Sequence, residues 1–391
     1  MRKQRWLLVL AGLGILCVLT LCMGLSVSRA EGDDERERAC FLASYQQELA
    51  KNYDGAITSL AGVPDSYLAQ LRLGWLHYMK GNYASALTAY ASAIKKCPDS
   101  IEARLGDLLP LLAKEDHPAV EKVAQQILGV DSVNYLASLR LAYSLRLQKK
   151  NDQALEVLDR MVKRYPTDTS LRIEQALNYT AKGQRETALP LYNGVLLLDP
   201  YNATAKPYAD AAGKAVRENF SKSYTCEGAK DYTGALAAIA NMPKSYLVEL
   251  RRGWLCYLKG EYPEAVTHYR AAIDTMPTST EAKLGSLLPM LAAQDYTETV
   301  VMARKVLADD KENYLANLRL AYALRLQKET KQAAAILERL VQHYPTDVSL
   351  LTEQGLVAQA NEDHDAAVQI FNKVLMLDPT NETAKAQLGI K

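Results

Sequence analysis

The stretch YLAQLRLGWLHYMKGNYASALTAYASAIKKCPDS, residues 67–100, has the features of two short helices joined by a turn. Gly74 and Ala86 are small residues that would let two antiparallel helices approach closely. Gly81 follows the first helical segment and suits a helix C-terminus. Pro98 ends the second segment, because proline cannot donate the next helical hydrogen bond. The stretch predicts a helix–turn–helix unit.

The same pattern returns with a 34-residue period. The recurring small residues and the closing proline are Ala142, Ala154 and Pro166 in unit 135–168, and Ala176, Ala188 and Pro200 in unit 169–202. The intervening unit, 101–134, keeps the length but shows a weaker pattern. Two helices of this size cannot bury their apolar faces alone, whereas stacked pairs share one continuous core. The period therefore predicts a stack of helix pairs.

A longer repeat contains the shorter one. NYLASLRLAYSLRLQK begins at Asn134 and NYLANLRLAYALRLQK at Asn313, and fourteen of these sixteen positions are identical. This 179-residue offset holds without a gap from about 44/223 to 206/385. A whole block of helix pairs has therefore been duplicated within the chain.

These quoted features resemble the tetratricopeptide repeat family, whose unit is a 34-residue helix–turn–helix. The resemblance implies an all-α fold, a right-handed α-solenoid of stacked repeats in two duplicated blocks. The full-length units would be 67–100, 101–134, 135–168, 169–202, 246–279, 280–313, 314–347 and 348–381. Shorter units near 37–66 and 216–245 would precede each set.

Six segments follow from this register. They are a signal peptide or N-terminal membrane anchor at 1–30, an acidic linker at 31–36, repeat block 1 at 37–202, a bridging helix at 203–215, repeat block 2 at 216–381, and a C-terminal helical stub at 382–391.

The segment 1–30 has the layout of an export sequence. A basic MRKQR precedes the uncharged segment Trp6–Leu25, and small residues then lead to Ala30. This order is typical of a secretory signal peptide cut after Ala30. Twenty uncharged, mostly apolar residues can also span a bilayer, with the basic N-terminus held in the cytoplasm. Both interpretations predict an exported protein: periplasmic and soluble if cleaved, anchored in the inner membrane if not.

Composition excludes some classes of function. The 46 basic residues are interspersed with 45 acidic ones, giving a net charge of +1, so no basic surface for nucleic acid is expected. No phosphate-binding, dinucleotide, nucleophile-elbow or zinc-protease motif occurs, and the five histidines are scattered. We expect no enzymatic activity, no cofactor and no metal site.

Four cysteines lie outside the apolar segment, at Cys40, Cys97, Cys226 and Cys256. None has a cysteine counterpart at the 179-residue offset. A disulfide framework that held each block together would have been duplicated with it, so free thiols are favoured. One disulfide in an exported protein remains the alternative.

The first helix of several units has a stripe of apolar and aromatic residues at spacing i, i+3, i+7 and i+10. In tetratricopeptide proteins such positions generally line the groove where peptides bind. The resemblance therefore implies these candidate partner-binding residues: Leu68, Leu71, Trp75, Tyr78, Tyr143, Arg146, Leu247, Leu250, Trp254, Tyr257, Tyr322 and Arg325. The alternative is that the stripe simply packs neighbouring helices.

The leading functional hypothesis is an exported, non-enzymatic scaffold that binds a protein, as a peptide or a helix, along this groove. A first alternative is an accessory subunit tethered to the inner membrane through Trp6–Leu25, assisting assembly of a cell-envelope machine for cell wall, polysaccharide or cytochrome biogenesis. Self-association through the groove or the C-terminal end is a further possibility. An enzyme with an unrecognised site is the least favoured.

Overall fold

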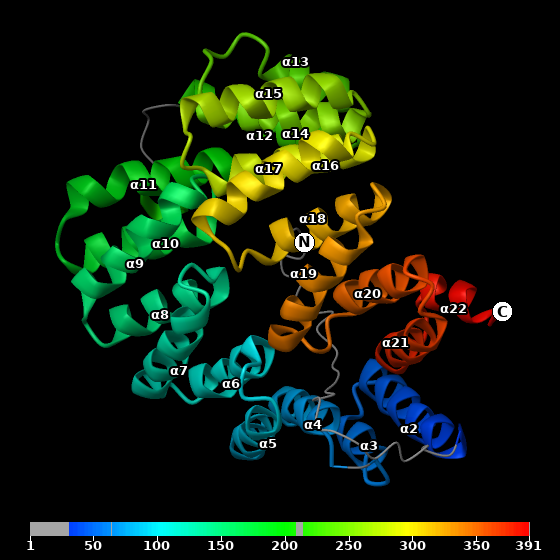
Figure 1. Cartoon of the computed structure of the whole chain (residues 1–391). Coiled ribbons are helices and arrows are strands. Elements are labelled where there is room, and N and C mark those ends of the chain that lie inside the picture. Colours follow the sequence, from blue (N-terminus) through cyan, green and yellow to red (C-terminus); the bar gives the residue numbers. More distant parts are fainter. Residues whose placement is uncertain (1–30, 64, 209–213, 391) are drawn as a thin grey trace. The chain divides into compact units, whose positions relative to one another are not determined.

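The structure is a computed structural model that describes residues 31–63, 65–208 and 214–390 (Figure 1). Every regular element within these ranges is a helix, and consecutive helices pack as antiparallel pairs, which confirms the predicted all-α repeat fold. The predicted export sequence at 1–30 lies outside the described residues. Among the helices that are described, none combines the length and apolar character required to cross a membrane.

The chain forms two compact units. The first comprises residues up to Val123 and from Leu324 onward, and the second comprises Ala124–Ala323. Each unit therefore takes helices from both predicted blocks, so the units do not coincide with the sequence duplication. The boundaries fall inside α7 (His117–Val130) and α18 (Tyr314–Leu326).

Unit 1 contains, besides its parts of α7 and α18, the helices α2 (Glu31–Leu49), α3 (Tyr53–Thr58), α4 (Tyr67–Met79), α5 (Tyr83–Lys96), α6 (Ile101–Ala113), α19 (Thr330–His343), α20 (Val348–Ala360), α21 (His364–Leu377) and α22 (Glu382–Leu388). One apolar core extends over both chain segments of this unit and includes Phe41, Leu68, Leu351 and Phe371.

Unit 2 contains α8 (Tyr135–Leu147), α9 (Asn151–Arg164), α10 (Thr169–Ala181), α11 (Arg185–Leu198), the 3-10 helix η1 (Lys206–Tyr208), α12 (Lys214–Gly228), α13 (Tyr232–Ala238), α14 (Tyr246–Lys259), α15 (Tyr262–Thr275), α16 (Thr280–Ala292) and α17 (Tyr296–Asp309).

The repeat boundaries have local causes. A short polar side chain caps the first helix of each full-length unit in block 1 by accepting a hydrogen bond from a backbone N–H three residues on, which satisfies a donor that the helix leaves unpaired. These caps are Ser66, Ser100, Asn134 and Asp168. At the turn, Gly81 has φ +84°, the left-handed conformation that closes a helix C-terminus.

Tyr90 joins one repeat to the next. Its ring is almost fully buried between Gly74 on α4 and Gly106 on α6. A methyl group added at Gly74 would lie 2.8 Å from Cε1 of Tyr90, and one added at Gly106 would lie closer still. The two glycines are therefore required by the ring, and the ring fills the space between two helix pairs.

Replacing Ala86 with leucine is expected to lower the free energy of unfolding by about 1–3 kcal/mol, because Ala86 is fully buried where α5 packs on α4 and three added carbons would overpack the contact. Denaturant unfolding would measure the change. Ala84→Leu, at an exposed position of the same helix, is the control. Equal unfolding midpoints for the two variants would contradict the assigned packing.

Two predicted segments differ from the structure. The acidic linker at 31–36 is the start of α2, since acidic residues are favoured in the first turn of a helix. The bridging helix predicted at 203–215 does not start as an α-helix: residues 206–208 form the 3-10 helix η1, residues 209–213 lie outside the described part of the chain, and α12 follows from Lys214. Pro207 accounts for part of this difference, because the residue before a proline is disfavoured in α-helical geometry.

Candidate partner-binding surface

The stripe predicted on α4 is partly core and partly surface. Leu68 and Leu71 are buried in the apolar core of unit 1. Trp75 and Tyr78 are half-buried, with ring centroids 5.9 Å apart. Tyr83, at the start of α5, continues the row at 6.0 Å from Tyr78. We call Trp75, Tyr78 and Tyr83 the aromatic row of unit 1.

The indole of Trp75 is fixed by a polar contact within the protein. Its Nε1 donates a hydrogen bond of 2.5 Å to Oε1 of Glu48 on α2. The other carboxylate oxygen of Glu48 pairs with the buried guanidinium of Arg72, which also stacks 4.1 Å from the ring centre of Tyr45. One carboxylate thus holds both α4 side chains, so the orientation of Trp75 is set before any partner arrives.

Unit 2 repeats this arrangement. Trp254 Nε1 donates a 3.0 Å hydrogen bond to Glu227, which also pairs with Arg251 at 2.6 Å. The ring centroid of Tyr257 lies 5.7 Å from that of Trp254 and 6.1 Å from that of Tyr262. We call Trp254, Tyr257 and Tyr262 the aromatic row of unit 2. The predicted stripe residues Leu247 and Leu250 are half-buried here.

Tyr143 on α8 and Tyr322 on α18 are the exposed members of the predicted set. Their exposed fractions are 40% and 39%. Within the described residues, they form the one pair of exposed large hydrophobic residues related by the 179-residue offset. Both copies of the block therefore present a tyrosine at the same place.

The two predicted arginines are engaged inside the protein. Arg146 forms a two-pronged ion pair with Glu174 on α10, and Arg325 forms the same pair with Glu353 on α20 at 2.6 and 3.1 Å. The Arg146 guanidinium also lies 5.4 Å from the ring centre of Tyr143. These arginines position neighbouring groups, and a partner carboxylate would have to compete with an internal one.

The carboxylates of these contacts were missed by the sequence analysis. They are Glu48, Glu174, Glu227 and Glu353. A usable indication was present: each acid and its arginine recur together at the 179-residue offset, with the arginine on an otherwise apolar helix face.

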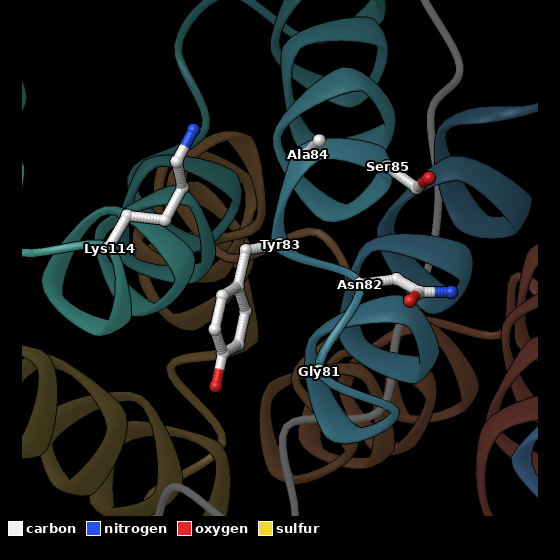
Figure 2. Close-up of a pocket in the computed structure, with 6 residues that line it drawn as sticks. All are labelled: Gly81, Asn82, Tyr83, Ala84, Ser85 and Lys114. Carbon is white, nitrogen blue, oxygen red and sulfur yellow. The ribbon is translucent and has the colours of Figure 1, made fainter.

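An open pocket of about 510 Å³ lies beside the aromatic row of unit 1. Figure 2 shows its lining: the turn at Gly81 and Asn82, the first residues of α5 including Tyr83, and Lys114 at the end of α6. Tyr83 thus belongs to both the row and the pocket wall.

The remaining chemistry is sparse. No group of three or more His, Cys, Asp or Glu side chains among the described residues could hold a metal ion. Cys40, Cys97, Cys226 and Cys256 are free thiols, of which only Cys256 is buried. The disulfide alternative is therefore not what the structure shows.

Stacked helix pairs with a 34-residue period define a class of helical-repeat scaffolds. Family models described as Tetratricopeptide repeat match residues 42–101, 136–168, 290–353 and 348–381. The chain belongs to the tetratricopeptide repeat family, and its repeats form a protein-interaction scaffold.

Three solved structures are similar to this chain at low identity. The APC/C hetero-tetramer Cut9-Hcn1 is 13% identical, with a TM-score of 0.39 over 92% of this chain and 85% of that one. A tetratricopeptide repeat protein from Parabacteroides merdae is 17% identical, with a TM-score of 0.33 over 83% and 97%. The MamA D159K mutant 1 is 19% identical, with a TM-score of 0.37 over 43% and 99%. At these scores the likenesses support no statement about partners.

Proposed function

We propose that the protein is an exported scaffold without catalytic activity, which binds an apolar peptide or amphipathic helix through the first helices of its repeats. The observation that carries this proposal is the pair Tyr143 and Tyr322, exposed at the same position of both copies. Packing alone does not require an aromatic ring at a position that is two-fifths exposed, so its presence in both copies points to contact with a partner.

The tyrosines suit this use because a phenol offers a broad apolar face and a polar tip with few rotatable bonds. The Arg146 guanidinium near the Tyr143 ring restricts it further, and Glu174 fixes the arginine. A partner side chain would therefore meet a ring that is already oriented, which lowers the entropy cost of binding.

The aromatic rows extend the same kind of surface. Trp75, Tyr78, Trp254 and Tyr257 keep part of their rings accessible, and the indole N–H groups of the two tryptophans are held within the protein. An amphipathic helix places apolar residues at the spacing of three and four that such a row accepts. The duplication supports two equivalent sites per chain, and linked sites gain avidity when both are engaged.

Peptide selection would test the binding surface. Peptides selected from a random display library against the purified chain are expected to be rich in aromatic and aliphatic residues and to bind two per chain. Replacing Tyr143 and Tyr322 with alanine should weaken that binding by about tenfold or more, because a buried aromatic side chain contributes about 1.5–3 kcal/mol.

Val301→Ala is the control. Val301 is an exposed hydrophobic residue of α17, and its counterpart at the 179-residue offset is Lys122, so this position is not apolar in both copies. Unchanged affinity in the double tyrosine variant, with binding intact in the control, would remove the tyrosines from the proposed site.

Export and tethering form a separable part of the proposal. They rest on the sequence of residues 1–30, with the uncharged Trp6–Leu25 segment between a basic start and Ala30. Fractionation of a C-terminally tagged chain, with sequencing of its mature N-terminus, distinguishes the outcomes. A start at Glu31 in the soluble exported fraction indicates cleavage, an uncut chain in the membrane indicates a tether, and an uncut chain in the cytoplasm would contradict export.

A further inference from the structure

A buried glutamate joins distant parts of the chain in unit 1. Glu102, at the start of α6, is 4% exposed. Its carboxyl accepts hydrogen bonds from the hydroxyl of Thr346, which lies 244 residues away just before α20, and from the hydroxyl of Tyr67 at 3.2 Å. Tyr67 is in turn 2.8 Å from the Ser100 hydroxyl. We call Glu102, Tyr67, Ser100 and Thr346 the unit 1 junction.

Unit 2 contains the equivalent junction at the 179-residue offset. Glu281 accepts hydrogen bonds from the hydroxyl and the backbone N–H of Thr167 and from the hydroxyl of Tyr246 at 3.0 Å. Tyr246 is 2.7 Å from Ser279. Both junctions thus join a Glu-bearing repeat of one block to the YPTD turn, 165–168 or 344–347, of the other.

The two junctions differ in one charged residue. Arg172 on α10 is half-buried in unit 2, and its Nε donates a hydrogen bond to the backbone oxygen of Pro166. It lies close enough to Glu281 for that carboxyl to act on its charge. The corresponding residue in unit 1 is Leu351 on α20, which is fully buried. The charge that could balance an ionised glutamate in unit 2 is therefore replaced by an apolar side chain in unit 1.

The neighbouring charge that acts on Glu102 is negative. Asp347 follows Thr346 and disfavours ionisation of Glu102. Cys97 and Asp99 lie in the loop before α6, where His343 of α19 contacts the backbone oxygen of Asp99 at 3.1 Å. Burial is the main cause that raises the pKa of Glu102 to about 8, opposed by its hydroxyl partners.

Three other features are common to both junctions and do not distinguish them. The aspartate that ends each YPTD turn, Asp347 in unit 1 and Asp168 in unit 2, disfavours ionisation of the neighbouring glutamate. Burial raises the pKa of Glu281 as well, again as the largest cause. A basic residue two positions after each glutamate is also duplicated, as Arg104 in unit 1 and Lys283 in unit 2. The contrast between the junctions therefore rests on Arg172.

We propose that the unit 1 junction is a proton-controlled clasp. While Glu102 is neutral, it holds the turn before α20 against the start of α6, and when Glu102 ionises the contact loosens. The unit 2 junction loosens less over the same pH range, because the positive charge of Arg172 partly offsets the ionisation of Glu281.

The direction of the pH effect follows from proton binding. A Glu102 exposed by local opening regains a pKa near its ordinary 4.5, whereas in the closed junction the value is about 8. Between these values the open form has released the proton and the closed form retains it. The closed form is therefore fully favoured below pH 4.5 and loses stability as pH rises toward about 8.

Hydrogen exchange of the full chain would measure this opening. After correction for the intrinsic exchange rate, the opening constant of backbone amides at the start of α6 and around residues 346–350 is expected to rise by about tenfold per pH unit between about pH 5 and pH 8. The amides around 167–171 and at the start of α16 are expected to change much less. An unchanged opening constant in unit 1 over this range would overturn the proposal.

Two variants assign the effect to the charged groups. Glu102→Gln keeps the shape and has no proton to lose, so its opening constant should be independent of pH. Arg172→Leu gives unit 2 the residue found at the equivalent place of unit 1, and it should steepen the pH dependence of the Glu281 junction toward that of unit 1. A wild-type pH dependence that persists in Glu102→Gln would overturn the clasp. A Glu281 junction with the same pH dependence in Arg172→Leu as in the wild type would overturn the role of the arginine.

Discussion

Replacing Tyr90 with alanine is expected to lower the free energy of unfolding by about 3–5 kcal/mol. The ring is 2% exposed and is packed against two glycines that leave no side chain to fill the space it would vacate. The helix pairs on either side can close this cavity only by moving together, so most of the lost contact would remain lost. Denaturant unfolding followed by circular dichroism measures the change.

Tyr201→Ala is the matched control. Tyr201 is 82% exposed, so its replacement should leave the free energy of unfolding almost unchanged. The duplicated residue Tyr269 packs between Gly253 and Gly285 in the same manner, and its alanine variant should show a similar loss. A loss below about 1 kcal/mol at Tyr90, with a normal slope against denaturant, would mean that the repeats collapse around the cavity and that the ring does not hold them apart.

Replacing Glu48 with alanine is expected to lower the free energy of unfolding by about 3 kcal/mol, the low end of the range for stranding a buried charge. Arg72 is 2% exposed and pairs with Glu48, which itself retains some contact with water. Without the carboxylate, the guanidinium is left in the core and Trp75 loses its acceptor. Unfolding midpoints and the fluorescence of Trp75 would both report the change.

Glu48→Gln separates charge from hydrogen bonding, since an amide oxygen can still accept from one of the two donors. It should be less harmful than the alanine variant. Glu227→Ala tests the equivalent contact with Arg251 and Trp254 in unit 2. If Glu48→Ala and Glu48→Gln were both neutral, the ion pair would contribute nothing to stability and Trp75 would be oriented by packing alone.

The helix pairs could be predicted because each rests on local signals. Ser66 and Ser100 mark helix starts, Gly81 marks a turn, and Gly74 and Tyr90 form a small-and-large pair within a single repeat. The 34-residue recurrence of such signals fixes the register. The bridging segment lacks such signals, since it is not a repeat, and Pro207 disfavours α-helical geometry at the residue before it.

The surface was harder to predict, because periodicity identifies a helix face without showing what covers it. Leu68 and Tyr143 both belong to the predicted stripe, on different repeats, yet one is in the core and the other is exposed. Whether such a residue is accessible depends on which segments, distant in sequence, pack over it. In unit 1, for example, residues of α20 and α21 belong to the same apolar core as Leu68. The junction glutamates were missed for the same reason, because Glu102 and Thr346 are 244 residues apart.

The fit of Tyr90 between two glycines also fixes which repeats can be neighbours. In units 67–100 and 246–279 the ring at this position is followed by a repeat with glycine at its sixth position, which is Gly106 in unit 101–134 and Gly285 in unit 280–313. In the unit after 135–168, the sixth residue is instead Glu174, which is committed to Arg146. Repeats at matching places of the two copies make the same contacts and are equivalent in this respect. Successive repeats within one copy make different contacts, so exchanging their order would break the fit between neighbours.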